Sequence, residues 1–174
     1  MSKKIGILGG TFDPPHKGHL IISKFSLKKL RLDHVIWAVT KKNPLKKKPM
    51  LSIDKRIHLC KEMVKSFKKF KIISYDTKIN SSESVNLIKH LKEFDKSSEY
   101  YFLIGSDNLI NLHKWKNWKE LTKICRIAIF PRRGYVAKSL TSKAFKSINK
   151  RNFIFLRSKL VNISSSKIRK NYLK

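Results

Sequence analysis

The chain has 174 residues, of which 41 are Lys or Arg and 11 are Asp or Glu, so its formal net charge is +30. Hydrophobic residues make up 41% of this length, enough for the core of one domain of ordinary size, and we expect a single domain over residues 1–174. No run approaches the roughly 18 apolar residues of a membrane span, and the N-terminus lacks the apolar core of a signal peptide. Cys60 and Cys125 are too far apart for a CxxC motif. We therefore expect a cytoplasmic protein.

Short apolar runs alternate with longer amphipathic stretches along the chain. The runs predict strands at Lys4–Gly9, His34–Thr40, Phe70–Tyr75, Tyr100–Gly105, Arg126–Phe130 and Phe153–Leu156. Apolar residues at helical spacing predict helices or helical turns at Gly18–Leu30, Ile53–Phe67, Ser84–Phe94, Asn108–Leu112, Lys116–Lys123, Lys138–Ile148 and Ser164–Leu173. This alternation predicts an α/β fold, a parallel sheet with helices on both faces. Because ligands of such sheets bind beyond the carboxyl ends of the strands, the residues after the first, second and fourth strands are the candidates for a binding site.

The first strand runs into the sequence GGTFDPPHKGHL, residues 9–20. This segment contains neither the GxGxxG pattern of dinucleotide-binding folds nor a Walker A loop. Gly9 and Gly10 allow the backbone to turn tightly and to approach a ligand, and Thr11 and Phe12 offer backbone N–H groups in the turn. The segment therefore predicts a ligand-binding turn between a strand and a helix.

His16 and His19 stand three residues apart where the chain enters the predicted helix, so both imidazoles can contact one anion at the helix N-terminus. A histidine in this position tends to have a lowered pKa, which makes both rings candidates for neutral hydrogen-bond donors. Zinc binding is an alternative, although no third ligand stands at a suitable spacing. Nucleophilic catalysis has less support, because no neighbouring residues form a set of nucleophile, base and orienting group.

Three segments resemble a known family. GTFDPPHKGH resembles the GxFDPxHxGH signature of the HxGH nucleotidyltransferases. IGSDNLINLHKWKNW (Ile104–Trp118) and ISSSKIR (Ile163–Arg169) resemble motifs of one branch, the nicotinate-nucleotide adenylyltransferases, with Ser166 where the family's ISSTxIR has Thr. The motifs stand in family order and the resemblance covers nearly the whole chain. It implies a Rossmann-like nucleotidyltransferase fold and transfer of the adenylyl group of ATP to nicotinate mononucleotide, which gives nicotinate adenine dinucleotide and pyrophosphate in NAD biosynthesis.

The resemblance implies an ATP site with two catalytic histidines. His16 and His19 would bind the phosphates and stabilise the charge that develops at the α-phosphorus, while Gly105 and Asp107 would lie near the nucleotide sugars. Asp107 has an alternative interpretation as the N-cap of the helical turns that follow it. The ATP-binding residues implied by the three motifs are Gly9, Gly10, Thr11, Phe12, His16, His19, Gly105, Asp107, Ile163, Ser164, Ser165 and Arg169.

The resemblance implies four residues for the mononucleotide. Trp115 matches the aromatic residue that stacks on the nicotinate ring, although a tryptophan of the core is the ordinary alternative. Ser84 opens a predicted helix whose N-terminal N–H groups suit the nicotinate carboxylate. Asn43 and Lys46 lie in the sequence NPLKKK, where many family members carry PPHK, and they are candidates for contacts to the phosphate or carboxylate of the substrate.

The resemblance also implies Mg²⁺, bound mainly through the ATP phosphates and without a dedicated set of protein ligands. The nearest alternatives are sister enzymes that act on nicotinamide mononucleotide or phosphopantetheine; the pantetheine branch lacks the segment of Gly105, Asp107 and Trp115, and the helix start at Ser84 favours the acid over the amide. An alternative from another class is a basic nucleic-acid-binding protein. Because the excess of Lys is spread along the whole chain, we favour a compositional origin of the charge over a nucleic-acid surface.

Overall fold

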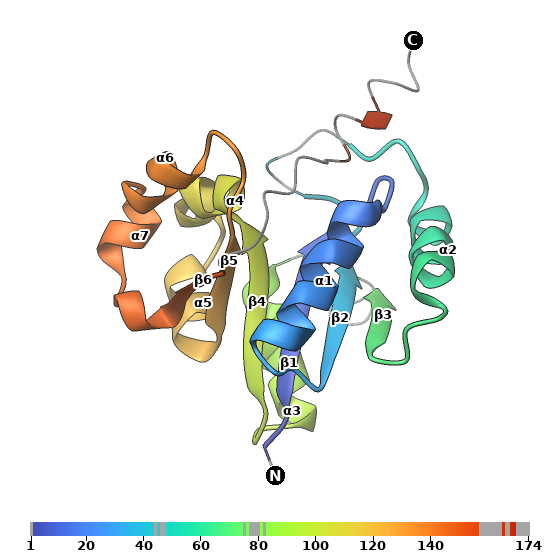
Figure 1. Cartoon of the computed structure of the whole chain (residues 1–174), viewed down its shortest axis with the longest axis horizontal. Coiled ribbons are helices and arrows are strands. Elements are labelled where there is room, and N and C mark those ends of the chain that lie inside the picture. Colours follow the sequence, from blue (N-terminus) through green and yellow to red (C-terminus); the bar gives the residue numbers. More distant parts are fainter. Residues whose placement is uncertain are drawn as a thin grey trace.

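The computed structural model describes residues 2–43, 45, 48–74, 76, 81, 83–156, 165 and 168–169. A parallel sheet of six strands lies at its centre (Figure 1). The strands are β1 (Lys4–Gly10), β2 (His34–Val39), β3 (Phe70–Ser74), β4 (Glu99–Gly105), β5 (Arg126–Phe130) and β6 (Phe153–Phe155). Their order is β3-β2-β1-β4-β5-β6, and every neighbouring pair is parallel. The strand order switches direction between β1 and β4, so a ligand crevice is expected at the carboxyl ends of these two strands.

Helices cover both faces of the sheet, which confirms the predicted α/β class. They are α1 (Lys17–Lys29), α2 (Ile53–Val64), α3 (Ser84–Phe94), α4 (Ser106–Asn111), α5 (Trp118–Ile124), α6 (Val136–Leu140) and α7 (Lys143–Ser147), with 3₁₀ turns η1 (Leu112–Lys114) and η2 (Lys150–Asn152). No helix of the described residues is long and apolar enough to cross a membrane.

The central strands of the sheet bury both of their faces. In β2, the side chains of Val35, Trp37 and Val39 belong to the core cluster that includes residues of α1 and α2. The alternate side chains, Ile36 and Ala38, belong to the cluster that includes residues of α3 and α5. Successive side chains of a strand point to opposite faces, so a strand between two helix layers is apolar along most of its length.

The predicted helix at Lys138–Ile148 is wrong. The segment forms two short helices, α6 and α7, because Ser142 has an extended backbone (φ −67°, ψ 151°) and its Oγ accepts a hydrogen bond from Phe145 N at 3.4 Å. This serine caps a new helix where the apolar spacing indicated a continuous one. The helix predicted at Ser164–Leu173 lies largely outside the described residues, and so does Tyr75 at the end of the predicted third strand.

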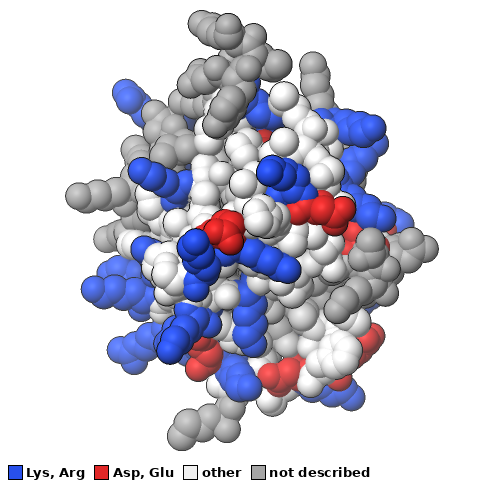
Figure 2. All heavy atoms as spheres, turned by 90° about the vertical axis from the view of Figure 1, so that its right-hand side faces the viewer, with Lys and Arg blue, Asp and Glu red and all other residues white. Residues whose placement is uncertain are grey.

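Figure 2 shows the side of the molecule that carries α2 and β3. Lys and Arg side chains are scattered over this face, and Asp and Glu side chains lie between them. A surface specialised for nucleic acid would gather its basic residues in one patch or stripe. The distribution on this face therefore agrees with a compositional origin of the positive charge.

Candidate active site

Two cavities meet at the carboxyl ends of β1 and β4, and Gly9 and Gly10 line both of them. The first, called the α1 pocket, has a volume of about 380 Å³ and is lined by the turn after β1, the start of α1 and the residues that follow β4 and β5. The second, called the α3 pocket, has a volume of about 310 Å³ and lies between the loop after β2, the N-terminus of α3 and the turn after η1. Because Gly9 and Gly10 have no side chains, molecules bound in the two pockets could come into direct contact over these two residues.

His16 and His19 enter the α1 pocket from the first turn of α1. His16 is the N-cap of the helix, and its Nδ1 accepts a hydrogen bond from Gly18 N at 3.1 Å. His19 Nδ1 accepts a hydrogen bond from His16 N, also at 3.1 Å, and the two rings stack with centroids 3.8 Å apart. Because each Nδ1 is an acceptor, the proton of each ring in its neutral form is on Nε2. In their neutral forms, both rings therefore carry Nε2–H as the donor group.

The protonation of His16 is set by its surroundings. Burial, and in second place the positive charge of Arg132, lower the pKa of His16 from its ordinary 6.5 to about 4. His16 is therefore a neutral hydrogen-bond donor at pH 7. The sequence predicted this direction from the position at a helix N-terminus, whereas the main cause in the structure is burial.

The turn formed by Gly9, Gly10, Thr11 and Phe12, called the glycine turn, contacts the histidine pair through the ring of Phe12. Phe12 has a left-handed backbone (φ 49°) and a buried ring. Its ring stacks on Trp37 with centroids 5.1 Å apart and lies 4.7 Å from the ring of His19. A positive φ is uncommon for a bulky residue, so the packing of this ring against the core stabilises the turn.

Gly105 and Asp107 follow β4 at the other side of the α1 pocket. The N-cap interpretation of Asp107 is wrong: Gly105 is the N-cap of α4, and Asp107 lies in the first turn, where its Oδ2 is 2.8 Å from Arg132 Nη1. Asp107 Oδ1 is buried and has no hydrogen-bond partner among the described residues. A Cβ atom at Gly105 would lie 2.3 Å from this oxygen, so any other residue at this position would displace the carboxylate.

Arg132 was not predicted from the sequence, although it lines the α1 pocket and pairs with Asp107. The available signal was its position directly after the fifth strand, where Pro131 ends the apolar run. The carboxyl end of that strand lies at the same edge of the sheet as the ends of β1 and β4.

Two described residues of the C-terminal motif, Ser165 and Arg169, contact the segment between the first strand and α1. Ser165 Oγ donates a hydrogen bond to Pro14 O at 2.9 Å. Arg169 Nη1 donates to the backbone oxygen of Asp13 at 2.5 Å and lies 3.5 Å from its carboxylate Oδ2. Ser165 and Arg169 also line the α1 pocket, so two motifs at opposite ends of the chain share one cavity.

Arg56 is a second residue that the sequence did not single out. Its guanidinium is buried and donates to the carbonyl oxygens of Thr11, Thr40, Lys41 and Leu51. It therefore ties the glycine turn to the loop after β2, which lines the α3 pocket. A charged residue within the apolar stripe of the predicted helix at Ile53–Phe67 was the available signal.

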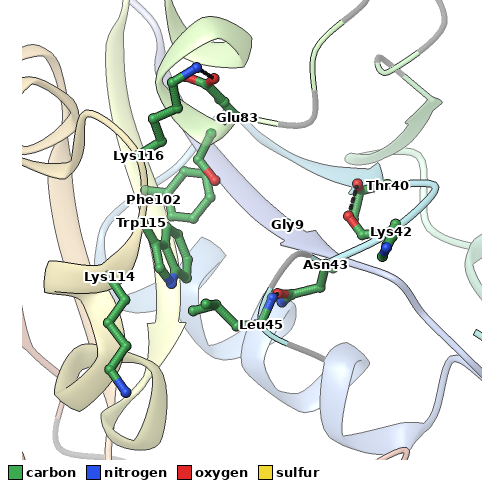
Figure 3. Close-up of a pocket in the computed structure, with 12 residues that line it drawn as sticks. Gly9, Thr40, Lys42, Asn43, Leu45, Glu83, Phe102, Lys114, Trp115 and Lys116 are labelled. Atoms are coloured by element: carbon green, nitrogen blue, oxygen red, sulfur yellow. Dashed lines mark hydrogen bonds and ion pairs between the residues drawn. The ribbon is translucent and has the colours of Figure 1, made fainter. Parts of the chain in front are cut away.

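The α3 pocket has an aromatic wall and a helix N-terminus (Figure 3). Trp115 lies edge-to-face against Phe102, with centroids 5.9 Å apart and an interplanar angle of 80°. Ser84 is the first residue of α3. On the opposite side, Asn43 Oδ1 accepts a hydrogen bond from Leu45 N at 2.9 Å. The sequence did not predict that charged side chains, Lys42, Glu83, Lys114 and Lys116, also line this pocket.

The structure gathers the predicted residues into the two pockets. Those in the α1 pocket are Gly9, Gly10, Thr11, Phe12, His16, His19, Gly105, Asp107, Ser165 and Arg169. Those in the α3 pocket are Asn43, Ser84 and Trp115. Lys46, Ile163 and Ser164 lie outside the described residues. In the part of the chain that the structure describes, no group of three or more His, Cys, Asp or Glu side chains is placed to hold a metal ion.

Comparison with known proteins gives consistent matches. A family model described as cytidylyltransferase-like matches residues 7–171. A protein of Pelagibacter ubique named probable nicotinate-nucleotide adenylyltransferase is 47% identical over 167 residues, which are 96% of this chain and 92% of the relative. A protein of Clostridium novyi with the same name is 38% identical over 173 residues, which are 96% of this chain and 86% of the relative. The solved structure of a Plasmodium falciparum nicotinic acid mononucleotide adenylyltransferase complexed with NaAD has the same fold, with a TM-score of 0.73 and 20% identity, and the match covers 97% of this chain and 83% of that chain.

Proposed function

The chain belongs to the cytidylyltransferase-like family and, within it, to the nicotinate-nucleotide adenylyltransferases, and from this membership we propose that it transfers the adenylyl group of ATP to nicotinate mononucleotide in NAD biosynthesis. The products are nicotinate adenine dinucleotide and pyrophosphate. The observation that carries the proposal is the meeting of two pockets at Gly9 and Gly10, one with two imidazoles and two arginines, the other with a tryptophan and a helix N-terminus. The α1 pocket would bind ATP and the α3 pocket the mononucleotide.

The proposed chemistry is one in-line displacement. An oxygen of the mononucleotide phosphate attacks the α-phosphorus of ATP and forms a new P–O bond, while the bond from the α-phosphorus to the bridging oxygen breaks and pyrophosphate leaves. Negative charge develops on the phosphate oxygens, and the Nε2–H donors of His16 and His19 with the guanidinium of Arg132 would stabilise it. No side chain has to gain or lose a proton, so catalysis would rest on positioning and electrostatics.

The remaining ATP contacts are proposals from the same geometry. Asp107 Oδ1 is buried without a hydrogen-bond partner among the described residues, and a ribose hydroxyl would supply the missing donor. Ser165 and Arg169 line the same pocket and would contact the phosphates. Ile163 and Ser164 belong to the same motif, and their contacts to ATP stay predictions from the sequence.

The mononucleotide contacts depend on the wall of the α3 pocket. Trp115 would stack on the nicotinate ring, with Phe102 packed edge-to-face against the indole. The ring carboxylate would accept hydrogen bonds from the first N–H groups of α3 at Ser84, where the helix dipole favours a negative charge. Asn43 would contact the substrate from the loop after β2, and Lys46 in the same loop stays a prediction.

We propose that ATP enters as its Mg²⁺ complex, with the ion held mainly by phosphate oxygens and reducing the charge of the triphosphate. The acidic side chains of the α1 pocket have other partners. Asp13 accepts hydrogen bonds from Met50 N at 2.8 Å and Leu51 N at 3.0 Å, and Asp107 is paired with Arg132. These contacts support an ion that arrives with its nucleotide.

A cytoplasmic location is part of the proposal. Cys60 and Cys125 are both buried free thiols, and burial raises the pKa of each to about 12. Unpaired cysteines are the ordinary state of proteins in a reducing compartment.

The proposal is tested by pyrophosphate release from ATP and Mg²⁺ with three acceptors: nicotinate mononucleotide, nicotinamide mononucleotide and phosphopantetheine. We expect a strong preference for nicotinate mononucleotide. Equal use of the acid and the amide would keep the reaction and remove the carboxylate contact at Ser84. Turnover of phosphopantetheine alone would move the chain to the sister branch, and no turnover with any acceptor from folded protein would overturn the proposal.

A variant of the histidine pair tests the catalytic role. His19→Ala removes one Nε2–H donor and should lower kcat by about a hundredfold, since removal of one transition-state donor typically has an effect of this size. Because His19 Nδ1 also bonds His16 N, the matched variant His19→Asn tests whether a side chain that can still accept this bond recovers folding without recovering turnover. Near-full activity of His19→Ala would remove His19 from the mechanism.

A further inference from the structure

The N-terminus of α3 carries a carboxylate next to the place proposed for the substrate's carboxylate. Glu83 is the N-cap of α3, and it is the one acidic side chain among the described residues that line the α3 pocket. Its carboxylate makes no capping hydrogen bond to the helix. Two like charges at this short range repel one another, and they do so most strongly where water is partly excluded. A pocket for an anionic ring therefore has to neutralise Glu83.

Two residues of the turn between η1 and α5 engage this carboxylate. Lys116 Nζ lies 2.6 Å from Glu83 Oε1, and Asn117 Nδ2 donates to Glu83 Oε2 at 3.3 Å. The side chain of Glu83 is only 20% exposed, whereas that of Lys116 is 75% exposed. Figure 3 shows the ion pair at the edge of the pocket, above the rings of Phe102 and Trp115. The negative charge is thus held at the pocket wall, and the lysine that neutralises it reaches in from solvent.

The turn that carries Lys116 also carries the stacking tryptophan. Trp115 directly precedes Lys116, and Asn117 has a left-handed backbone (φ 52°), which asparagine adopts more readily than most residues. The carboxylate of Glu83 therefore joins the start of α3 to the segment that positions Trp115. This contact has an electrostatic effect on a ring bound in the pocket and a structural effect on the position of Trp115. The two effects can be separated, because only the electrostatic effect distinguishes a charged ring from a neutral ring.

We propose that Lys116 determines the preference for the acid over the amide ring by neutralising Glu83, an inference that rests on the proposed function of the α3 pocket. With the lysine charge present, the pair is neutral, and the first N–H groups of α3 attract the ring carboxylate. Without that charge, the Glu83 carboxylate repels a ring carboxylate and can accept a hydrogen bond from a ring amide. Glu83 and Lys116 are specificity-determining residues in this scheme, and neither takes part in bond breaking.

The test uses variants that remove charge and keep size. Lys116→Met keeps the aliphatic stem, and Glu83→Gln keeps an oxygen that can accept the Asn117 hydrogen bond. The control is Lys89→Met, which removes the ion pair of 2.7 Å between Lys89 and Glu120; this pair also joins α3 to α5, and neither of its residues lines the α3 pocket. The measured quantity is the ratio of the KM for nicotinate mononucleotide to the KM for nicotinamide mononucleotide, with kcat followed in parallel.

Lys116→Met should raise this ratio about tenfold, because it leaves one unpaired like charge beside the ring carboxylate. The double variant Glu83→Gln with Lys116→Met should return the ratio to within about twofold of the wild-type value, since both charges are then absent. Lys89→Met should leave the ratio unchanged.

Three results would overturn the proposal: equal increases of both KM values in Lys116→Met, no change in either, or a double variant that keeps the ratio of Lys116→Met. Inactivity of the wild-type protein with both mononucleotides would instead refute the proposed function. In that case the charge effect is tested by calorimetric titration of the two mononucleotides into the wild type and the same variants. The measured quantity is then the ratio of the two Kd values.

Discussion

Arg56 is the side chain whose replacement should disturb both pockets at once. It is 2% exposed, and it donates to Thr11 O at 2.5 Å, Thr40 O at 2.7 Å, Leu51 O at 3.1 Å and Lys41 O at 3.2 Å. Thr11 belongs to the turn of the α1 pocket, and Thr40 lines the α3 pocket. Without the guanidinium, four carbonyl groups lose a donor, and the two substrate loops lose their common anchor.

The magnitude follows from these four bonds. A hydrogen bond to a charged group contributes about 1.5–3 kcal/mol, so four amount to about 6–12 kcal/mol before the cost of burying the guanidinium is subtracted. Removal of one partner from a buried charged network lowers stability by about 3–5 kcal/mol net, and we expect this loss in Arg56→Met. In Arg56→Lys one ammonium group replaces a planar fork and cannot reach all four carbonyl oxygens, so the free energy of unfolding should fall by about 2 kcal/mol.

Urea denaturation measures the loss. With a slope of about 2 kcal/mol per molar urea, Arg56→Lys should lower the midpoint by about 1 M. The matched control is Arg126→Lys, an exposed arginine on β5, for which we expect a change within about 0.5 kcal/mol. The KM values for both substrates of Arg56→Lys should rise about tenfold, because small displacements of substrate-positioning loops have large kinetic effects. An Arg56→Lys protein with a wild-type midpoint and wild-type KM values would refute this account of Arg56.

Three further changes probe single features of the pockets. The pKa of His16 is lowered from 6.5 to about 4, so on acidification the unfolded chain takes up a proton at this residue before the folded protein does. The contribution of His16 to the free energy of unfolding is therefore fully present above pH 6.5, and about 3 kcal/mol of it is lost as the pH falls to 4. Urea denaturation measures the free energy of unfolding at pH 7 and at pH 4. The decrease between the two pH values should be smaller by about 3 kcal/mol in His16→Asn than in the wild type, and equal decreases would contradict the lowered pKa of His16. Gly105→Ala places a Cβ 2.3 Å from Asp107 Oδ1, so the carboxylate must move and weaken its ion pair with Arg132; the KM for ATP should rise about tenfold with little change for the mononucleotide, and an unchanged KM for ATP would count against the role of Asp107. Trp115→Ala should show the reverse pattern, an increase of about tenfold in the KM for the mononucleotide alone, and an equal increase for ATP would indicate a general loss of structure instead of a lost stacking contact.

Local patterns determined much of the fold and of the site. Each of the six strands was recognisable as a short apolar run, because a strand that buries both faces is apolar at consecutive positions and not only at alternate ones. Most of the segments that line the α1 pocket were recognisable as motifs, since the residues from Gly9 to His19 are continuous in the chain; the segment of Arg132 was not. The predicted helix at Lys138–Ile148 failed for a local reason, because Ser142 fits a capping position as well as a helical one, and apolar spacing does not distinguish the two.

Apolar runs and motifs were thus sufficient for the α/β class, for the family and for most of the residues at the carboxyl ends of the strands. Which of these residues meet depends on tertiary contacts. Arg132 pairs with Asp107 across 25 positions, Asn117 reaches Glu83 across 34, and the guanidinium of Arg56 reaches Thr11 across 45. Such contacts depend on strand order and on the paths of loops, which no local period encodes, because the free energy that selects them comes from packing and charge between segments distant in the chain.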